Sequence, residues 1–388
     1  MNPESKQVKL ALLLVSSLTI MSMITISASL PDMTDHFKYL DNGDKLVKFT
    51  LSFPGLFIAL SAIIAGIVID KVGRLKLLGA ALLFYAVGGT AGFWLDDIYL
   101  ILAGRALLGI CVGISMTIVT TLVADYYKGQ ARQQFAGLQI AVMSLGGIVF
   151  ITLGGFLADI SWRVPFLLYA FSLLILPFAY KHLKEPIHEV VINKAKEVKS
   201  PRIIWFVFVN IMLMWILFFI IPIQIPFYLK DIGIESNGLI GIAIASSTFF
   251  SAISAISYGK ISKSLNFKQV FIIGYFIMAL AFLVLAYGNS YAMVLLAMLL
   301  AGLGMGIMIP NANVWVMQLA PIEIRGREIG RLTTFWFMGQ FLSPLLLLPL
   351  LDIFNQEQMF LMVAGILVIL SVIFVVMLFT GKNKHTQN

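Results

Sequence analysis

Arg105 is the one charged side chain that lies well inside a long apolar stretch of the sequence, residues 98–124. It stands about seven residues, or about 10 Å of helix, from the start of that stretch. An arginine in the hydrocarbon region of a membrane is costly and is by default a functional candidate. It would contact a substrate or change the proton affinity of a nearby acid. The alternative is a structural arginine that donates to carbonyl groups of neighbouring helices.

The 19 acidic residues all lie in polar loops or at the ends of apolar stretches. Proton exchange across a membrane needs a titratable group that can face either side. The nearest candidates are Asp32 and Asp35, at the outer end of the first apolar stretch. Of the two, we expect Asp32 to take up and release the proton while Arg105 changes its proton affinity. The alternative is that both belong to an ordinary solvated loop that also contains Asp41 and Asp44.

Side chains for other chemistry are scarce. Cys111 is the single cysteine, which excludes a disulfide framework and any zinc or iron–sulfur site built on cysteine. The four histidines all fall in polar stretches: His36, His182, His188 and His385. No cluster of catalytic residues is visible. We therefore expect no metal site, no cofactor and no enzyme.

The elements that position these residues are apolar helices. Of the 388 residues, 60% are hydrophobic and 12% charged, about half the charged fraction of a soluble domain. Crossing a bilayer as a helix takes about 20 mostly apolar residues. Twelve such stretches are present, which predicts an all-α integral membrane protein. They are residues 10–31, 47–69, 77–95, 98–124, 134–158, 164–181, 203–229, 237–259, 269–287, 291–318, 328–351 and 358–380.

The basic residues indicate the orientation of these spans. With the N-terminus inside, 21 of the 27 Lys and Arg residues fall in cytoplasmic segments and five in outer segments. Lys and Arg accumulate on the cytoplasmic side of membrane proteins. The net charge of +8 is thus explained by topology, and we expect no nucleic-acid partner. We predict a multi-pass protein of the cell membrane, in contact with the lipid bilayer, with both termini cytoplasmic.

The longest polar interruption, residues 182–202, divides the spans six and six. We therefore predict a six-helix bundle over 1–181, a cytoplasmic linker over 182–202 and a second bundle over 203–388. A shift of 193 residues superposes the halves without a gap. It matches Gly66 with Gly259, Gly109 with Gly302, Gly113 with Gly306, Arg132 with Arg325, Gly137 with Gly330 and Gly146 with Gly339. Such parallel repeats are typical of transporters that hold substrate between the halves.

A motif with two placed glycines joins the second and third spans. It runs Gly66-Ile-Val-Ile-Asp70-Lys71-Val-Gly73-Arg74-Leu-Lys76. The second glycine permits a tight turn, whereas the acid ends a helix whose dipole disfavours it. The segment resembles the cytoplasmic signature of the major facilitator superfamily. That resemblance implies that Asp70 contacts the start of span eleven and latches the outward-open state. A merely positive inside loop is the alternative.

Two further segments resemble motifs of proton antiporters in that superfamily. Arg105-Ala-Leu-Leu-Gly109 is similar to the R-x-x-Q-G pattern of span four, with Leu108 in place of glutamine. Span five has the glycine spacing of the antiporter motif, with Phe150-Ile151 where Gly-Pro is expected. Its glycines are Gly137, Gly146, Gly154 and Gly155. Close helix packing alone would also explain such glycines.

Polar residues inside the spans are candidates for contact with substrate. They are Asn210, Gln224, Asn311, Asn313, Thr333, Trp336 and Gln340. Thr333, Trp336 and Gln340 are spaced to share one helix face. Each of these groups would equally serve as a hydrogen bond between helices.

Taken together, the resemblance implies a twelve-span secondary transporter, closest to the drug:proton antiporters. We therefore expect a monomer that exports a small organic compound, drug-like or of the siderophore type, by alternating access in exchange for protons. Uptake or facilitated diffusion of a sugar or other metabolite is the alternative, followed by a channel or a membrane-embedded enzyme.

The topology is testable by labelling with a thiol reagent that does not cross membranes. In a chain whose Cys111 is replaced by serine, Ser236→Cys should react with reagent added outside intact cells. Ser200→Cys should react only after the cells are opened. Labelling of the second variant alone in intact cells would reverse the predicted orientation.

Overall fold

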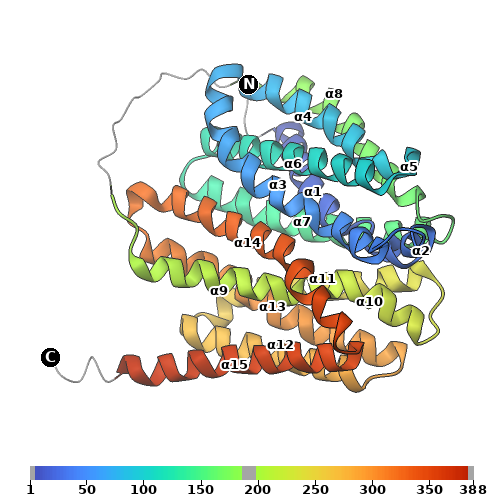
Figure 1. Ribbon diagram of the computed structural model, residues 1–388. Helices are drawn as coiled ribbons and strands as arrows, with labels where there is room; N and C mark the ends of the chain where they lie inside the picture. Colours follow the sequence, from blue (N-terminus) through green and yellow to red (C-terminus); the bar gives the residue numbers. More distant parts are fainter. Residues whose placement is uncertain (1–4, 186–197, 383–388) are drawn as a thin grey trace. The chain divides into compact units, whose positions relative to one another are not determined.

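The computed structural model describes residues 5–185 and 198–382 (Figure 1). Within these ranges it leaves undescribed the side chains of Ile67, Asp70, Gln133, Glu323 and Lys382. The described residues form helices and connecting turns and contain no strand. In lipid a helix satisfies its own backbone polar groups, which explains this uniformity.

The first six spans are built from the helices before the undescribed segment. These are α1 (Lys6–Ile24), η1 (Ser27–Ser29), α2 (Leu30–His36), α3 (Gly43–Val72), α4 (Arg74–Gly89), α5 (Ala91–Trp94), α6 (Ile98–Tyr126), α7 (Gly129–Ala158), η2 (Val164–Ala170) and α8 (Phe171–His182).

The other six spans follow it. They are built from α9 (Arg202–Phe218), α10 (Ile220–Asp231), α11 (Asn237–Ile261), α12 (Phe267–Tyr287), α13 (Tyr291–Leu319), η3 (Ile322–Ile324), α14 (Arg325–Leu347), η4 (Leu348–Asp352) and α15 (Gln356–Lys382). In total, twelve helical segments of the described chain are long and apolar enough to cross a membrane, and each overlaps one predicted stretch. The predicted all-α, twelve-span fold is confirmed.

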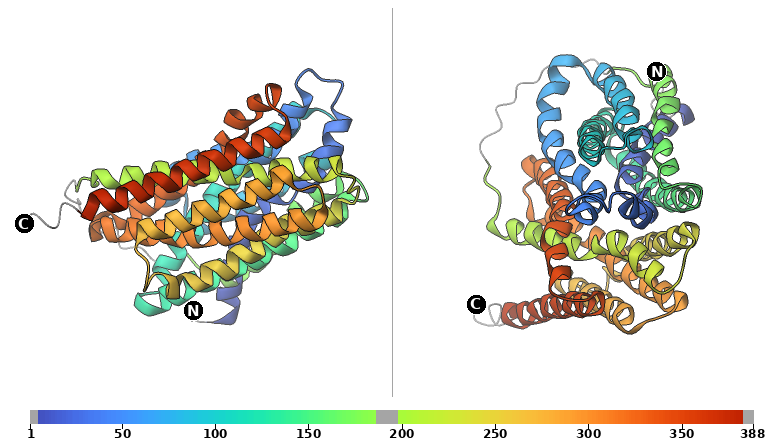
Figure 2. Two further views of the ribbon diagram at one scale, coloured as in Figure 1. Left: turned by 90° about the horizontal axis from the view of Figure 1, so that it is seen from below. Right: turned by 45° about the vertical axis from the view of Figure 1, so that its right-hand side comes forward.

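The chain divides into two compact units. The first comprises the described residues of Met1–Lys194 together with Ser236–Ile242 and Gln340–Pro344; the second comprises the remainder. In the first unit α3 and α4 pack against α6, and α1 packs against α7. In the second, α12 packs against both α13 and α15 (Figures 1 and 2).

The 193-residue repeat reappears in the contacts between helices. A Cβ at Gly109 would lie less than 3 Å from the carbonyl oxygen of Pro54, and one at Gly302 would meet Ser247, which is Pro54 shifted by 193. Gly113 and Gly306 likewise face the carbonyls of Ile58 and Ser251, again one shift apart. Gly137 and Gly330 both face open space. These equivalent glycines therefore have similar surroundings in the two units. The pair of Gly146 and Gly339 differs, because only a Cβ at Gly339 would overlap a neighbouring helix, at the carbonyl of Met212.

Helix starts follow the repeat as well. Helices α6 and α13 begin one shift apart, after Asp97 and Ser290, and each of these residues caps its helix with its side chain. Side-chain oxygens at this position satisfy amide groups that have no partner within the helix.

The first and seventh spans are both broken near their middle. Helix α1 ends at Ile24 before a 3-10 turn, and α9 ends at Phe218 before α10. These ends lie within one residue of each other after the 193-residue shift. Interrupted helices at corresponding places in two repeats are typical of a transporter's substrate region.

The packing glycines give a stability prediction with an internal control. We expect Gly113→Ala and Gly306→Ala each to destabilise the protein by about 1–3 kcal/mol, because the added methyl group must displace a neighbouring backbone. Gly137→Ala and Gly330→Ala should leave stability unchanged or raise it by up to about 1 kcal/mol, since alanine favours helix over glycine. Thermal unfolding in detergent measures both pairs, and equal effects of all four substitutions would contradict the repeat in packing.

Candidate functional site

Arg105 is completely buried and ties three elements of the first unit to α6. Its Nε donates to the carbonyl oxygen of Thr50 in α3 at 2.7 Å, and its Nη2 donates to that of Ser22 in α1 at 2.8 Å. The guanidinium carbon lies 5.2 Å from the centre of the Tyr169 ring in η2. Its remaining nitrogen, Nη1, has no hydrogen-bond partner in the described part of the chain.

Both carbonyl partners lack their usual helical donor. Ser22 lies in the last turn of α1, where carbonyls have no amide ahead of them. Thr50 lies four residues before Pro54, which has no N–H to give. Arg105 therefore stabilises two backbone groups that would otherwise be unsatisfied inside the membrane. These contacts are those expected of a structural arginine that donates to the carbonyls of neighbouring helices. Of the three guanidinium nitrogens, only Nη1 takes no part in them.

Asp32 lies in the first turn of α2 and is bonded within the first unit. Its Oδ2 accepts a hydrogen bond from the side-chain amide of Asn237 at 2.6 Å, at the start of α11. The carboxylate of Asp159 accepts from the backbone amides of Asn237 and Gly238 at the same helix start. Carboxylates are stabilised at helix N-termini by the unpaired amides and the dipole. Asp32 is thus half-buried and hydrogen-bonded, unlike a solvated loop residue.

The motif of residues 66–76 has the turn that its second glycine predicts. Gly73 has φ +91°, a conformation that side chains disfavour, and it separates α3 from α4. Arg74 is buried and forms an ion pair with Asp125 in the last turn of α6. Lys71 and Lys76 are exposed, Gly66 has open space around it, and the side chain of Asp70 lies outside the description.

The four glycines of span five are not equivalent. A Cβ at Gly154 would overlap the backbone of Thr25, at the break of the first span, and one at Gly155 would overlap the start of α11 within the same unit. Gly146 makes only ordinary contact with Ser17, and Gly137 faces open space. Among these four glycines, close packing is therefore confined to the two at the C-terminal end of α7.

The three asparagines among the predicted polar residues make hydrogen bonds within the second unit. The hydroxyl of Tyr275 donates to Oδ1 of Asn210 at 2.8 Å, joining α12 to α9. Asn311 accepts from Tyr258 and donates to the carbonyl of Phe267. Asn313 donates to a carbonyl of its own helix.

The other polar candidates lie in α10 and α14. Thr333 donates to a carbonyl of its own helix, and the amide nitrogen of Gln340, in the first unit, lies 3.4 Å from the carbonyl of Leu51. Gln224 is buried. Trp336 lies beside Trp215 of α9, with ring centres 5.9 Å apart, and both indole N–H groups lack a partner in the described residues.

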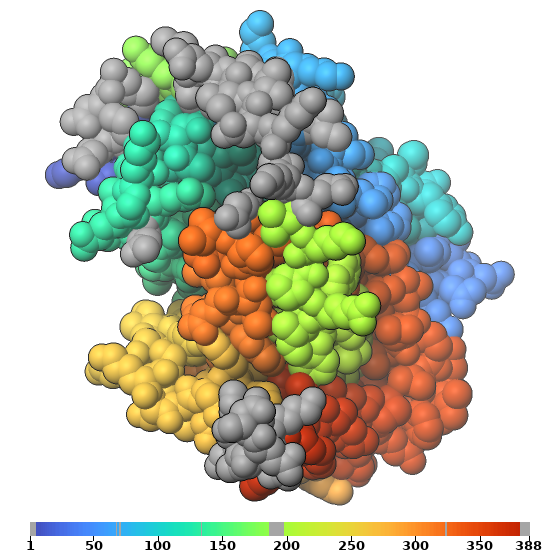
Figure 3. All heavy atoms as spheres, turned by 90° about the vertical axis from the view of Figure 1, so that its left-hand side faces the viewer, coloured from blue at the N-terminus to red at the C-terminus, as the bar shows by residue number. Residues whose placement is uncertain are grey.

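Sequence reasoning missed one buried acid in the second unit. Glu328, in the first turn of α14, is 0% exposed and accepts hydrogen bonds from Ser200, Arg327 and Arg331. Figure 3 shows the start of α9, in light green, beside orange residues of the same unit. The basic residue three positions later, Arg331, was the available signal, because residues three apart are neighbours on a helix surface.

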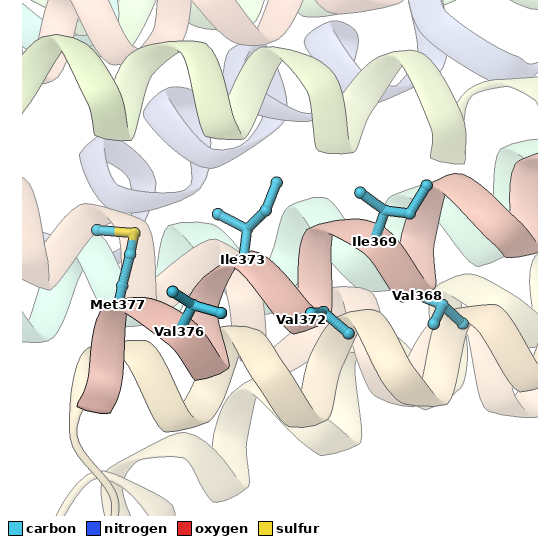
Figure 4. A pocket seen from close by; sticks show the side chains of 6 residues that line it. All are labelled: Val368, Ile369, Val372, Ile373, Val376 and Met377. Atoms are coloured by element: carbon cyan, nitrogen blue, oxygen red, sulfur yellow. The ribbon is translucent and has the colours of Figure 1, made fainter. Parts of the chain in front are cut away.

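An apolar groove of about 330 Å³ runs along α15. It is lined by six side chains: Val368, Ile369, Val372, Ile373, Val376 and Met377 (Figure 4). Nothing in this lining could orient a polar substrate by hydrogen bonding. Such a surface suits contact with lipid tails.

Twelve apolar helices with a parallel internal repeat define a membrane transporter of the secondary class. Residues 12–239 and 235–388 both match the profile of the Major Facilitator Superfamily. The chain belongs to this superfamily.

Two curated relatives of the chain are named as an efflux pump and an exporter, and a third is named for drug resistance. It is 26% identical over 343 residues to the multi-drug resistance efflux pump PmrA of Streptococcus pneumoniae, covering 83% of this chain and 84% of that protein. It is 27% identical over 312 residues to the bacillibactin exporter of Bacillus subtilis, covering 72% and 75%. It is 24% identical over 320 residues to the quinolone resistance protein NorA of Staphylococcus aureus, covering 79% and 81%.

Solved structures agree in fold. A D-xylose–proton symporter aligns with a TM-score of 0.76 at 17% identity, covering 95% of this chain and 96% of that one. A bacterial homologue of the human lysosomal transporter Spinster aligns with a TM-score of 0.77 at 15% identity, covering 95% and 96%.

The Arg105 contacts give a prediction about stability. We expect Arg105→Met to destabilise the protein by about 3 kcal/mol, because two buried carbonyls lose a charged donor. Adding Pro54→Ala restores an amide for Thr50 and should recover part of that loss. Thermal unfolding of the single and double variants measures the coupling, and purely additive effects would contradict this role.

Proposed function

We propose that this protein exports a small organic compound by alternating access in exchange for protons. The observation that carries transport is the pair of broken spans at equivalent positions of the two repeats, after Ile24 and after Phe218. Export is supported by the three relatives, two of which are named for drug resistance and one for release of bacillibactin.

The substrate-contacting groups that we propose in the second unit are Trp215 and Trp336. Their rings, inclined at 41°, offer apolar faces, and each retains an indole N–H for an acceptor. Aromatic side chains bind planar apolar compounds through their faces. These groups suit an organic compound that carries oxygen or nitrogen acceptors.

The cytoplasmic motif would serve as the gate. We propose that Asp70 latches the outward-open state, together with the basic residues of the same motif, Lys71, Arg74 and Lys76. The buried pair of Arg74 with Asp125 supports this proposal, because it fixes one end of the motif to α6.

For coupling we propose Asp32 as the proton-exchanging group, with Arg105 influencing its proton affinity. The half-buried position of Asp32 and its hydrogen bond to Asn237 support the proposal. A carboxylate whose partner changes between states binds its proton with a different affinity in each.

The second candidate is a facilitator or symporter for a sugar or other metabolite with the same fold. It is favoured by one observation: among the acidic side chains that the structure describes, none lies in the middle of a span. A facilitator needs no titratable group there.

Transport into proteoliposomes under an imposed pH difference separates these functions. With a panel of organic cations, siderophore-type chelators and sugars, the wild type should accumulate one class against its gradient. Asp32→Asn should lose this accumulation while retaining downhill exchange. The exposed Asp35→Asn in the same helix is the matched control and should behave as wild type.

Two results would overturn parts of the proposal. Accumulation by Asp32→Asn driven by the pH difference alone would exclude Asp32 as the proton site. A wild type that ignores the pH difference would favour the facilitator.

A further inference from the structure

The helix that follows the cytoplasmic motif is capped from a distant part of the chain. Glu185 accepts hydrogen bonds from the backbone amides of Arg74 at 2.8 Å and Leu75 at 2.9 Å, one on each carboxylate oxygen. These amides belong to the first turn of α4, where helical N–H groups have no partner within the helix. The carboxylate comes from just beyond α8, at the other end of the first six spans.

The motif itself explains why α4 cannot supply its own cap. Its N-cap residue is Gly73, which has no side chain and whose φ of +91° disfavours the residues that usually cap. The first turn contains no acid but carries Arg74 and Lys76. Basic side chains are unfavourable at the positive end of the helix dipole, whereas a carboxylate is stabilised there. A carboxylate from another part of the chain is therefore favoured at this helix start.

The second repeat provides the comparison. Helix α12 begins at Phe267, which is Arg74 shifted by 193 residues, and its N-cap is Asn266 in place of Gly73. Asn266 and Gln269 form a capping box, so this helix caps itself. Of these two equivalent helix starts, that of α12 is therefore capped by its own residues, whereas that of α4 is capped by Glu185.

The segment that carries Glu185 is docked at a second point. The hydroxyl of Tyr126 accepts a hydrogen bond from the backbone amide of Lys184 at 3.0 Å. The same hydroxyl donates a hydrogen bond to the backbone carbonyl oxygen of Lys184. Tyr126 follows Asp125, the partner of Arg74. Residues 184 and 185 thus join the end of α6 to the start of α4, on both sides of the Arg74–Asp125 pair.

We propose that Glu185 is a positioning residue for the cytoplasmic gating motif. By capping α4 it holds the Gly73 turn and keeps Arg74 on Asp125, so that the motif is presented in one geometry. This inference rests on the proposed transport function, in which that motif serves as the gate.

Hydrogen–deuterium exchange tests the cap without any substrate. Glu185→Gln keeps the size of the side chain but replaces one acceptor oxygen with an amide donor. In purified protein, exchange in the peptide containing Arg74 and Leu75 should rise about three- to tenfold, the effect of losing a typical cap. Lys184→Ala is the matched control, because Lys184 contacts Tyr126 through its backbone, and its exchange should equal that of the wild type.

Transport measures the positioning role. Glu185→Gln should lower the maximal transport rate severalfold at unchanged KM and unchanged unfolding temperature, and Glu185→Asp should recover part of the rate. Unchanged exchange at the start of α4, or raised exchange with a wild-type transport rate, would overturn the inference. A wild type that transports nothing would instead count against the proposed function, and the exchange result would still decide the cap.

Discussion

The structure depends on one requirement: every backbone polar group placed in a membrane must find a partner within the protein. Continuous helices meet it by themselves. This chain departs from continuity at the break after Ile24 and at Pro54, and each departure leaves a carbonyl without its helical donor. Arg105 donates to both. The cost of burying a guanidinium is offset by these charge-assisted bonds, which also hold α1 and α3 against α6.

Close helix contact is the second requirement, since lipid tails provide no hydrophobic force between helices. The glycines at 109 and 113 let α6 approach the carbonyls of α3, and those at 302 and 306 do the same between α13 and α11. The duplication has therefore preserved backbone contacts more faithfully than side-chain chemistry. Arg105 has a methionine at the shifted position, and Pro54 has a serine.

Much of this fold is predictable from the sequence because its signals are local. Apolar length predicts each span, and Gly73 predicts its turn. The candidate site is less predictable, because its contacts join residues far apart in the chain. Arg74 pairs with Asp125, and Glu185 caps a helix that begins 111 residues earlier. The sequence also identifies Asn210 and Asn311 as polar residues within spans. It does not reveal that they accept hydrogen bonds from Tyr275 and Tyr258.

Because the two helix caps come from different parts of the chain, the two equivalent helix starts are capped at different times during synthesis. Asn266 precedes α12 directly, so that helix has its cap as soon as its first turn leaves the ribosome. The first turn of α4 must wait until α8 and the residues after it have been made. Until then its amides are left to water or to other groups at the membrane surface. The first six spans therefore complete this helix start only near the end of their own synthesis, whereas the last six complete the equivalent one early.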